Sequence, residues 1–194
     1  MDTITALISW TCYGQWLHGS VRGSVDPEHN SVEAPWLAAN VEREESARKR
    51  MDQPAYEMDA ERRRVVLAAI RNVCTHRNWT LHAVHVRPRH VHVVVSGAQS
   101  PERMMNDFKA YASRALNEAR LDHPTRKRWT KHGSTRYIND EAYLAAAINY
   151  VLCKQGEPME RWPESTLPDG RGSSDENSSR TSENENEPRP SGSA

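Results

Sequence analysis

The sequence has few cysteines and no long apolar run. Three of its 194 residues are cysteines, and Cys12, Cys74 and Cys153 lie far apart with no CxxC pair. This spacing offers neither a zinc cage nor a disulfide framework, and it is typical of a reducing compartment. No apolar stretch approaches the roughly 18 residues of a membrane span, and no secretory signal opens the chain. We therefore expect a cytoplasmic protein with no membrane association.

The chain as a whole has no net charge, but its charges are distributed unevenly along the sequence. Lysine and arginine total 26, as do aspartate and glutamate, so the formal net charge is zero. Residues 163–194 contain seven acidic residues and three arginines, a balance of −4, which leaves +4 on residues 1–162. A mildly basic body is compatible with a polyanionic partner.

The composition changes at Pro163. Residues 163–194 are rich in Ser, Glu, Asn, Gly and Pro, and only Leu167 and Ala194 are apolar. Such a segment cannot bury enough surface to offset its ordering entropy, so we expect a disordered acidic tail. A partner-binding or DNA-mimicking tail is the alternative. The domain then comprises residues 1–162, in which 19–56 form a long loop or insertion with one short charged helix near 42–50.

The remaining residues predict alternating strands and helices. Apolar β runs cover residues 4–10, 81–86 and 90–95, and another strand is expected around 129–138. Helices are expected from Asp59 to about 76, from Pro101 onward, and from a cap at Asn139 or Asp140 to about Lys154. This order predicts an α+β sandwich, with one mainly antiparallel sheet and helices packed against it.

The strongest chemical signal is the pair His90 and His92 within an apolar strand. Because side chains alternate along a strand, both imidazoles project from one face while Val91 projects from the other. Two adjacent imidazoles can bind one divalent metal ion. The alternative is two half-exposed histidines on a sheet face, and we take His82 and His85 as ordinary strand histidines.

The last predicted helix carries Tyr150 beside an apolar stripe formed by Leu144, Ile148 and Val151. A phenol has a pKa near ~10 and is a poor nucleophile at neutral pH. Near a divalent cation that withdraws charge from a phosphate, it becomes competent for in-line attack. Such an attack leaves a phosphotyrosine, which preserves the energy of the phosphodiester for rejoining. The alternative is a tyrosine that packs at the border of the stripe.

Several segments together resemble the HUH single-tyrosine transposases, in particular the REP-associated tyrosine transposases. Residues 89–95, RHVHVVV, resemble the NHVHLLL-type strand of that family, and residues 108–117, FKAYASRALN, resemble its basic helix. The segments 11–19, TCYGQWLHG, and 129–137, WTKHGSTRY, are also similar to family members. The resemblance covers roughly residues 4–160, and the segments occur in the family's order.

The resemblance implies a ferredoxin-like sheet with helices on one side. It implies that His90 and His92 bind Mg²⁺ or Mn²⁺ and that Tyr150 is the nucleophile. The expected reaction is cleavage of single-stranded DNA at or near a hairpin, giving a 5′-phosphotyrosine and a free 3′-hydroxyl. Relatives often supply a third ligand one helical turn after the tyrosine; Lys154 occupies that position here, so the following Gln155 is the candidate. Relatives act as monomers or as homodimers, and both remain open.

Nucleic-acid contacts are expected from the basic residues. Residues 100–137 contain nine lysines or arginines and four acidic residues, beside Trp129 and Tyr137. This composition suits backbone contacts and base stacking, although a solvated charged face is the alternative. The candidates for DNA contacts are Arg89, which replaces the family's usual asparagine, Lys109, Arg114, Lys131 and Arg136.

Two other functions remain open from the sequence. One is a domesticated HUH nickase that processes repeats or replication origins. The other is a non-catalytic nucleic-acid-binding module in which the histidines are structural.

Overall fold

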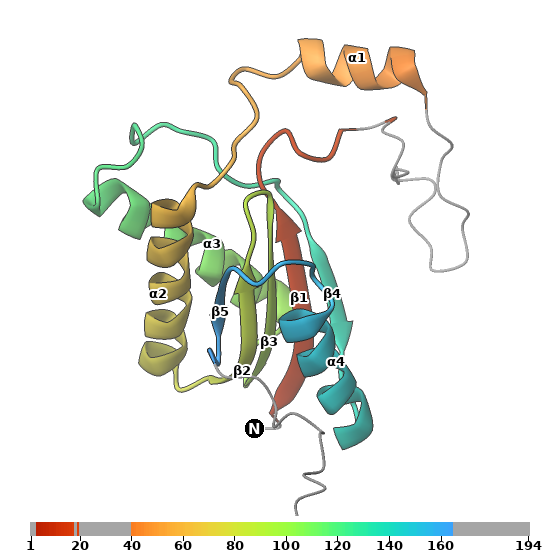
Figure 1. The fold of residues 1–194 in the computed structure, drawn as a ribbon, viewed down its shortest axis with the longest axis vertical. Helices are drawn as coiled ribbons and strands as arrows, with labels where there is room; N and C mark the ends of the chain where they lie inside the picture. Colours follow the sequence, from red (N-terminus) through yellow and green to blue (C-terminus); the bar gives the residue numbers. More distant parts are fainter. Residues whose placement is uncertain (1–2, 18, 20–39, 165–194) are drawn as a thin grey trace, which may run out of the picture.

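The computed structural model describes residues 3–17, 19 and 40–164. The predicted disordered tail, apart from its first two residues, and most of the first half of the predicted 19–56 loop lie outside this part of the chain. The elements are, in chain order (Figure 1), β1 (Ile4–Thr11), α1 (Val41–Lys49), α2 (Ala60–Arg77), β2 (Thr80–Val86), β3 (His90–Gly97), α3 (Pro101–Glu118), β4 (Ser134–Tyr137), α4 (Glu141–Cys153) and β5 (Glu160–Trp162).

The strands form one five-stranded sheet in the order β4-β1-β3-β2-β5, and every neighbouring pair is antiparallel. The first strand of the chain therefore lies inside the sheet, between β4 and β3. The succession β1-α2-β2-β3-α3-β4 with the order β4-β1-β3-β2 is the ferredoxin-like arrangement. The predicted fold class is confirmed.

Helices cover both faces of the sheet (Figure 1). Side chains such as Ile8, Trp10 and Val93 project from one face into the main core, together with residues of α2 and α3. Ala83 and Val94 project from the opposite face, where α4 covers them. The implied placement of helices on one side is therefore wrong for α4, because a second set of buried apolar residues on the alternate positions of β2 and β3 requires a cover of its own.

The three longer helices each begin after a residue that caps them, and Asp140 is one of the two caps expected for the last helix. Asp59, Ser100 and Asp140 precede α2, α3 and α4, and each accepts a hydrogen bond from the backbone N–H three residues on. The short charged helix predicted near residues 42–50 is α1, which is capped by Asn40 and buries none of its residues. Local capping chemistry thus defines where each of these helices begins.

The strand predicted around 129–138 is shorter than expected. Of residues 129–138, only Ser134–Tyr137 pairs with β1 as a strand, and Trp129 forms an isolated bridge with Cys12. The ammonium group of Lys109 on α3 donates to the carbonyls of three of the four intervening residues, Thr130, Lys131 and His132, at 3.0, 3.4 and 3.2 Å. These carbonyls are consequently turned toward a side chain instead of a neighbouring strand.

No helix within the described residues is long and apolar enough to cross a membrane.

Candidate active site

The two predicted metal-binding histidines lie on the sheet face that α4 covers. His90 and His92 are on β3, and their ring centroids are 4.9 Å apart. In the β1–β3 register, Thr11 lies opposite His90 and Ser9 lies opposite His92. The hydroxyl of Ser9 is 2.6 Å from Nδ1 of His92. The serine hydroxyl can donate to this nitrogen or accept from it, according to the tautomer of the ring, and in both cases it holds the orientation of the imidazole.

The structure brings Tyr150 to this histidine pair. Its ring centroid lies 5.7 Å from that of His92, at an interplanar angle of 77°. Tyr150 is 44% exposed, whereas the next residue, Val151, is fully buried against the sheet. The side chain therefore stands at the border of the buried stripe, in contact with the histidine and open to a substrate from solvent.

Gln155 completes the cluster because α4 ends early. The helix stops at Cys153, Lys154 caps it, and Gly156 has a positive φ of 78° that turns the chain. Gln155 hydrogen-bonds the His92 ring, and its Nε2 also donates to the Tyr150 carbonyl at 3.3 Å. Gln155, five positions after the tyrosine, therefore lies beside His92.

The environment keeps His92 neutral. Burial and the neighbouring His90 lower the pKa of His92 from 6.5 to about 3, and the hydrogen bond to Gln155 only partly opposes this shift. A neutral imidazole is the form that binds metal ions, and desolvation favours it here.

The cluster fits a divalent cation with open coordination positions. The two imidazoles lie side by side on this face, Gln155 contacts one of them, and the Ser9 hydroxyl bonds the same ring, as outer partners of metal ligands do. Within the described residues there is no group of three or more His, Cys, Asp or Glu side chains that could hold a metal ion. The cation would therefore depend on His90, His92, Gln155 and oxygen ligands from water or substrate.

His85 lies beside His92 in the sheet but serves another purpose. It is fully buried, and its ring nitrogens contact the Val151 carbonyl at 3.0 Å and the Met159 backbone N–H at 3.3 Å. Both nitrogens are satisfied by backbone groups, so His85 is not a ligand in this arrangement. Ser9 was not predicted, because β1 also carries the hydroxyls of Thr5 and Thr11 and nothing in the sequence distinguishes one of the three.

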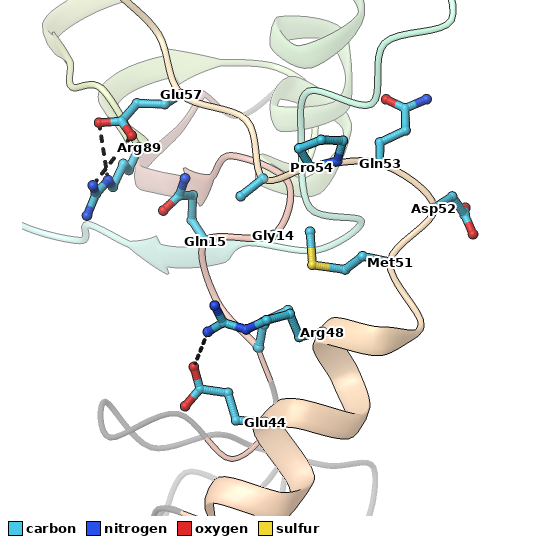
Figure 2. A pocket seen from close by; sticks show the side chains of 12 residues that line it. Gly14, Gln15, Glu44, Arg48, Met51, Asp52, Gln53, Pro54, Glu57 and Arg89 are labelled. Atoms are coloured by element: carbon cyan, nitrogen blue, oxygen red, sulfur yellow. Dashed lines mark hydrogen bonds and ion pairs between the residues drawn. The ribbon is translucent and has the colours of Figure 1, made fainter.

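Arg89 is at the turn between β2 and β3, next to His90. Its guanidinium forms an ion pair with Glu57 at 3.3 Å (Figure 2). Both residues line a cavity of about 700 Å³ whose other walls come from α1, residues 51–55 and the segment after β1. His90, His92 and Tyr150 do not line it, so this cavity adjoins the site and does not contain it.

The other predicted DNA contacts are spread over both sides of the sheet. Arg136, on the edge strand β4, lies opposite Leu7 and so shares the face of His92. Lys131 is exposed in the segment before β4. Arg114 is on α3, behind the sheet, with its guanidinium 4.3 Å from the Tyr111 ring centroid. Lys109 is only 8% exposed and directs its ammonium group at three carbonyls, so its position supports a structural role.

This fold and cluster place an imidazole pair, an amide and an accessible tyrosine on one face of an antiparallel sheet. The family model described as "Transposase IS200 like" matches residues 54–151, about half of the chain. The chain belongs to the IS200-like transposase family.

Solved structures show weaker likenesses. A REP-associated tyrosine transposase bound to a REP hairpin is 10% identical, with a TM-score of 0.45, and the match covers 77% of this chain. The chain spans 65% of that protein, which is under two thirds of its length. A protein of Deinococcus radiodurans R1 described as a transposase is 14% identical, with a TM-score of 0.39, over 77% of this chain and 88% of that protein. No curated protein sequence matches the chain.

Proposed function

We propose that this protein is a metal-dependent transposase that cuts and rejoins single-stranded DNA at hairpin-type ends through a 5′-phosphotyrosine. The observation that carries the proposal is the contact between Tyr150 and His92, at 5.7 Å between ring centroids, with His90 beside them. These residues come from different elements, β3 and α4, and one sheet face joins them. Membership in the IS200-like transposase family supports the same reaction class.

In this proposal the hydroxyl oxygen of Tyr150 attacks the scissile phosphorus. The new bond joins that oxygen to the phosphorus, which stays on the 5′ end of the downstream strand. The bond from the phosphorus to the 3′-oxygen of the upstream strand breaks. The phenol gives up its proton as this bond forms, and the leaving 3′-oxygen takes up a proton and departs as a free 3′-hydroxyl. The later attack of a 3′-hydroxyl on the phosphotyrosine reverses these changes and joins two strands.

His90, His92 and Gln155 would hold a Mg²⁺ or Mn²⁺ ion in this site. The cation would withdraw charge from the phosphate, which favours attack by a weak nucleophile. Ser9 would orient His92, and the exposed side of Tyr150 would face the DNA strand. Arg136, on the same face, and Arg89, at the adjoining turn, are the basic residues best placed to bind phosphates.

The test is to incubate the purified protein with Mg²⁺ or Mn²⁺ and hairpin-bearing single-stranded DNA from beside its own gene. We expect a covalent protein–DNA adduct on denaturing gels. Tyr150→Phe should abolish it, and so should the double variant His90→Ala with His92→Ala.

Tyr143→Phe is the matched control. Tyr143 is on the same helix, two turns earlier, and is also 44% exposed, so this variant should retain the adduct. DNA binding without any adduct would favour the non-catalytic module, and an adduct that survives Tyr150→Phe would exclude this tyrosine as nucleophile. A domesticated nickase differs in biology more than in chemistry: it would form the adduct without mobilising its gene.

A further inference from the structure

The last turn of α4 is held to the sheet by side chains. The final carbonyls of a helix have no partner within the helix and must be satisfied elsewhere. In α4, the carbonyls of Tyr150, Val151 and Leu152 all accept hydrogen bonds that are described below. This turn is the one that carries the tyrosine.

His85 on β2 supplies one of these bonds. Its Nδ1 lies 3.0 Å from the Val151 carbonyl, and its Nε2 accepts from the Met159 backbone N–H at 3.3 Å. A neutral imidazole with its proton on Nδ1 satisfies both contacts, and His85 is fully buried. One side chain therefore ties the end of α4 to the segment that leads into β5.

Arg161 on β5 supplies the second bond. Its Nη1 donates to the Leu152 carbonyl at 2.8 Å, and it lies directly opposite His85 in the β2–β5 register. The neighbouring Glu160 carboxylate accepts from Nε of Arg63 on α2. The short strand β5 is thus held by the Arg63–Glu160 ion pair with α2, and through Arg161 it holds the end of α4.

The Tyr150 carbonyl is held locally. It accepts from the Lys154 backbone N–H at 3.2 Å and from Nε2 of Gln155 at 3.3 Å. Three consecutive carbonyls are therefore bound, two of them by side chains of neighbouring strands.

Apolar packing alone does not fix this turn as closely. Ala147, Val151 and Leu152 determine which side of α4 faces the sheet. Non-directional contacts of small residues tolerate small shifts and rotations, whereas a shift of α4 by one residue would move Tyr150 by about 1.5 Å and rotate it by about 100°. Directional bonds to successive carbonyls oppose such movements.

We propose that His85 is a positioning residue, which together with Arg161 fixes the last turn of α4 so that Tyr150 meets His92. The inference rests on the proposed function of Tyr150. It assigns a role to β5 and to a histidine that binds no ligand in this arrangement.

The test compares variants that differ in one donor. His85→Asn keeps an N–H close to the place of Nδ1, whereas His85→Leu removes both polar contacts. Arg161→Met removes the bond to Leu152 while keeping much of the side chain, and Arg161→Gln retains a donor. Each variant is assayed for the single-turnover rate of adduct formation, for DNA affinity, and for amide hydrogen exchange of residues 146–155 and of β1 and β3.

We expect His85→Leu and Arg161→Met to slow adduct formation by roughly 100-fold, the cost of misplacing a reacting group by about 1 Å. DNA affinity should change little. Exchange should rise at least tenfold in residues 146–155 and stay unchanged in β1 and β3. His85→Asn and Arg161→Gln should recover much of the rate.

Three results would overturn the proposal. One is an unchanged adduct rate in both His85→Leu and Arg161→Met. Another is a uniform rise of exchange across the sheet, which indicates general loss of stability. The third is normal exchange in residues 146–155. Failure of the wild-type protein to form an adduct would instead remove the proposed function, and this inference with it.

Discussion

Ser9 is the residue whose position most changes the interpretation of the histidine pair. It lies on β1, where Ile8 and Trp10 point into the main core and Ser9 points to the other face. There its hydroxyl contacts His92 at 2.6 Å. A hydroxyl at this place holds the orientation of the ring.

We predict that Ser9→Ala weakens Mn²⁺ binding by roughly 10–100-fold, the usual cost of losing an outer partner of a ligand. Calorimetric titration of the DNA-free protein with Mn²⁺ measures it. Thr5→Ala is the matched control, because Thr5 is on the same face of β1 but bonds Ser96. Equal affinities in the wild type and Ser9→Ala would show that the serine does not orient a ligand.

Individual residues were predictable only where the signal is local. The two-residue period placed His90 and His92 on one face, because that period is a property of the strand itself. Ser9 could not be assigned, since its contact depends on the β1–β3 register across more than eighty residues. Lys109 was grouped with the DNA contacts from charge alone, and the structure buries it under the turn that it binds.

At the scale of elements, one carboxylate joins three segments. Asp122, in the loop after α3, accepts from the Tyr56 hydroxyl at 2.6 Å, from Arg62 at 3.1 Å and from Arg128 at 3.0 Å. Burial alone would raise the pKa of Asp122, but these hydrogen bonds outweigh it and hold the pKa below its usual value. The stability that this carboxylate contributes is therefore present at neutral pH and is lost as the pH falls through its lowered pKa.

Asp122→Asn should destabilise the protein by about 3–5 kcal/mol, because it leaves the buried Arg128 guanidinium without its counter-charge. Urea unfolding at neutral pH measures the change. Asp52→Asn removes a carboxylate whose ion pair with Lys127 is exposed, and it should have little effect. Similar losses in both variants would contradict the assignment of the network as structural.

The elements themselves were largely predictable. The helices α2, α3 and α4 and the first three strands lie close to the bounds predicted from apolar periodicity and from helix starts at Asp59, at Pro101 and at Asn139 or Asp140. The position of α4 across the sheet could not be predicted, because it depends on a second buried cluster assembled from β2, β3 and α4. The three-residue strand β5 is too short to show a period.

At the scale of the whole molecule, folding buries two thiols, those of Cys12 and Cys74, and this burial favours their protonated form. Burial raises the pKa of Cys12, with a smaller contribution from Glu57, and the pKa of Cys74, in both cases from 9.0 to about 12. In the unfolded chain these thiols ionise from about pH 9, so between about pH 9 and 12 the unfolded state binds fewer protons. The free energy of unfolding must then fall as the pH rises through that range.

We predict a loss on the order of 1 kcal/mol per thiol by about pH 10. Tyr56, whose pKa burial and Asp122 also raise, adds to the same decline. Urea unfolding at several alkaline pH values should show a shallower decline for Cys74→Ala. Cys153→Ser should leave the slope unchanged, because Cys153 is exposed. A pH-independent stability would mean that the thiols are accessible to water.

A single chain carries the histidine pair, the tyrosine and Gln155 within one cluster. Mixing Tyr150→Phe with the His90→Ala, His92→Ala double variant should therefore not restore adduct formation. Titration of one inactive variant into the other, followed on denaturing gels, measures this. Recovery of activity would indicate that two chains exchange α4 to build each site.

The position of β1 also bears on how the protein is made. This strand emerges first among the described elements, yet its two neighbours in the sheet are residues 90–97 and 134–137. During synthesis one edge of this apolar strand stays unpaired until residues 90–97 have left the ribosome, and the other until residues 134–137 have left it. Unpaired edges invite association with other chains. Tyr150 follows later still. A nascent chain is therefore most in need of chaperones before residues 134–137 emerge, and the cluster of Tyr150 with the histidines can form only after them.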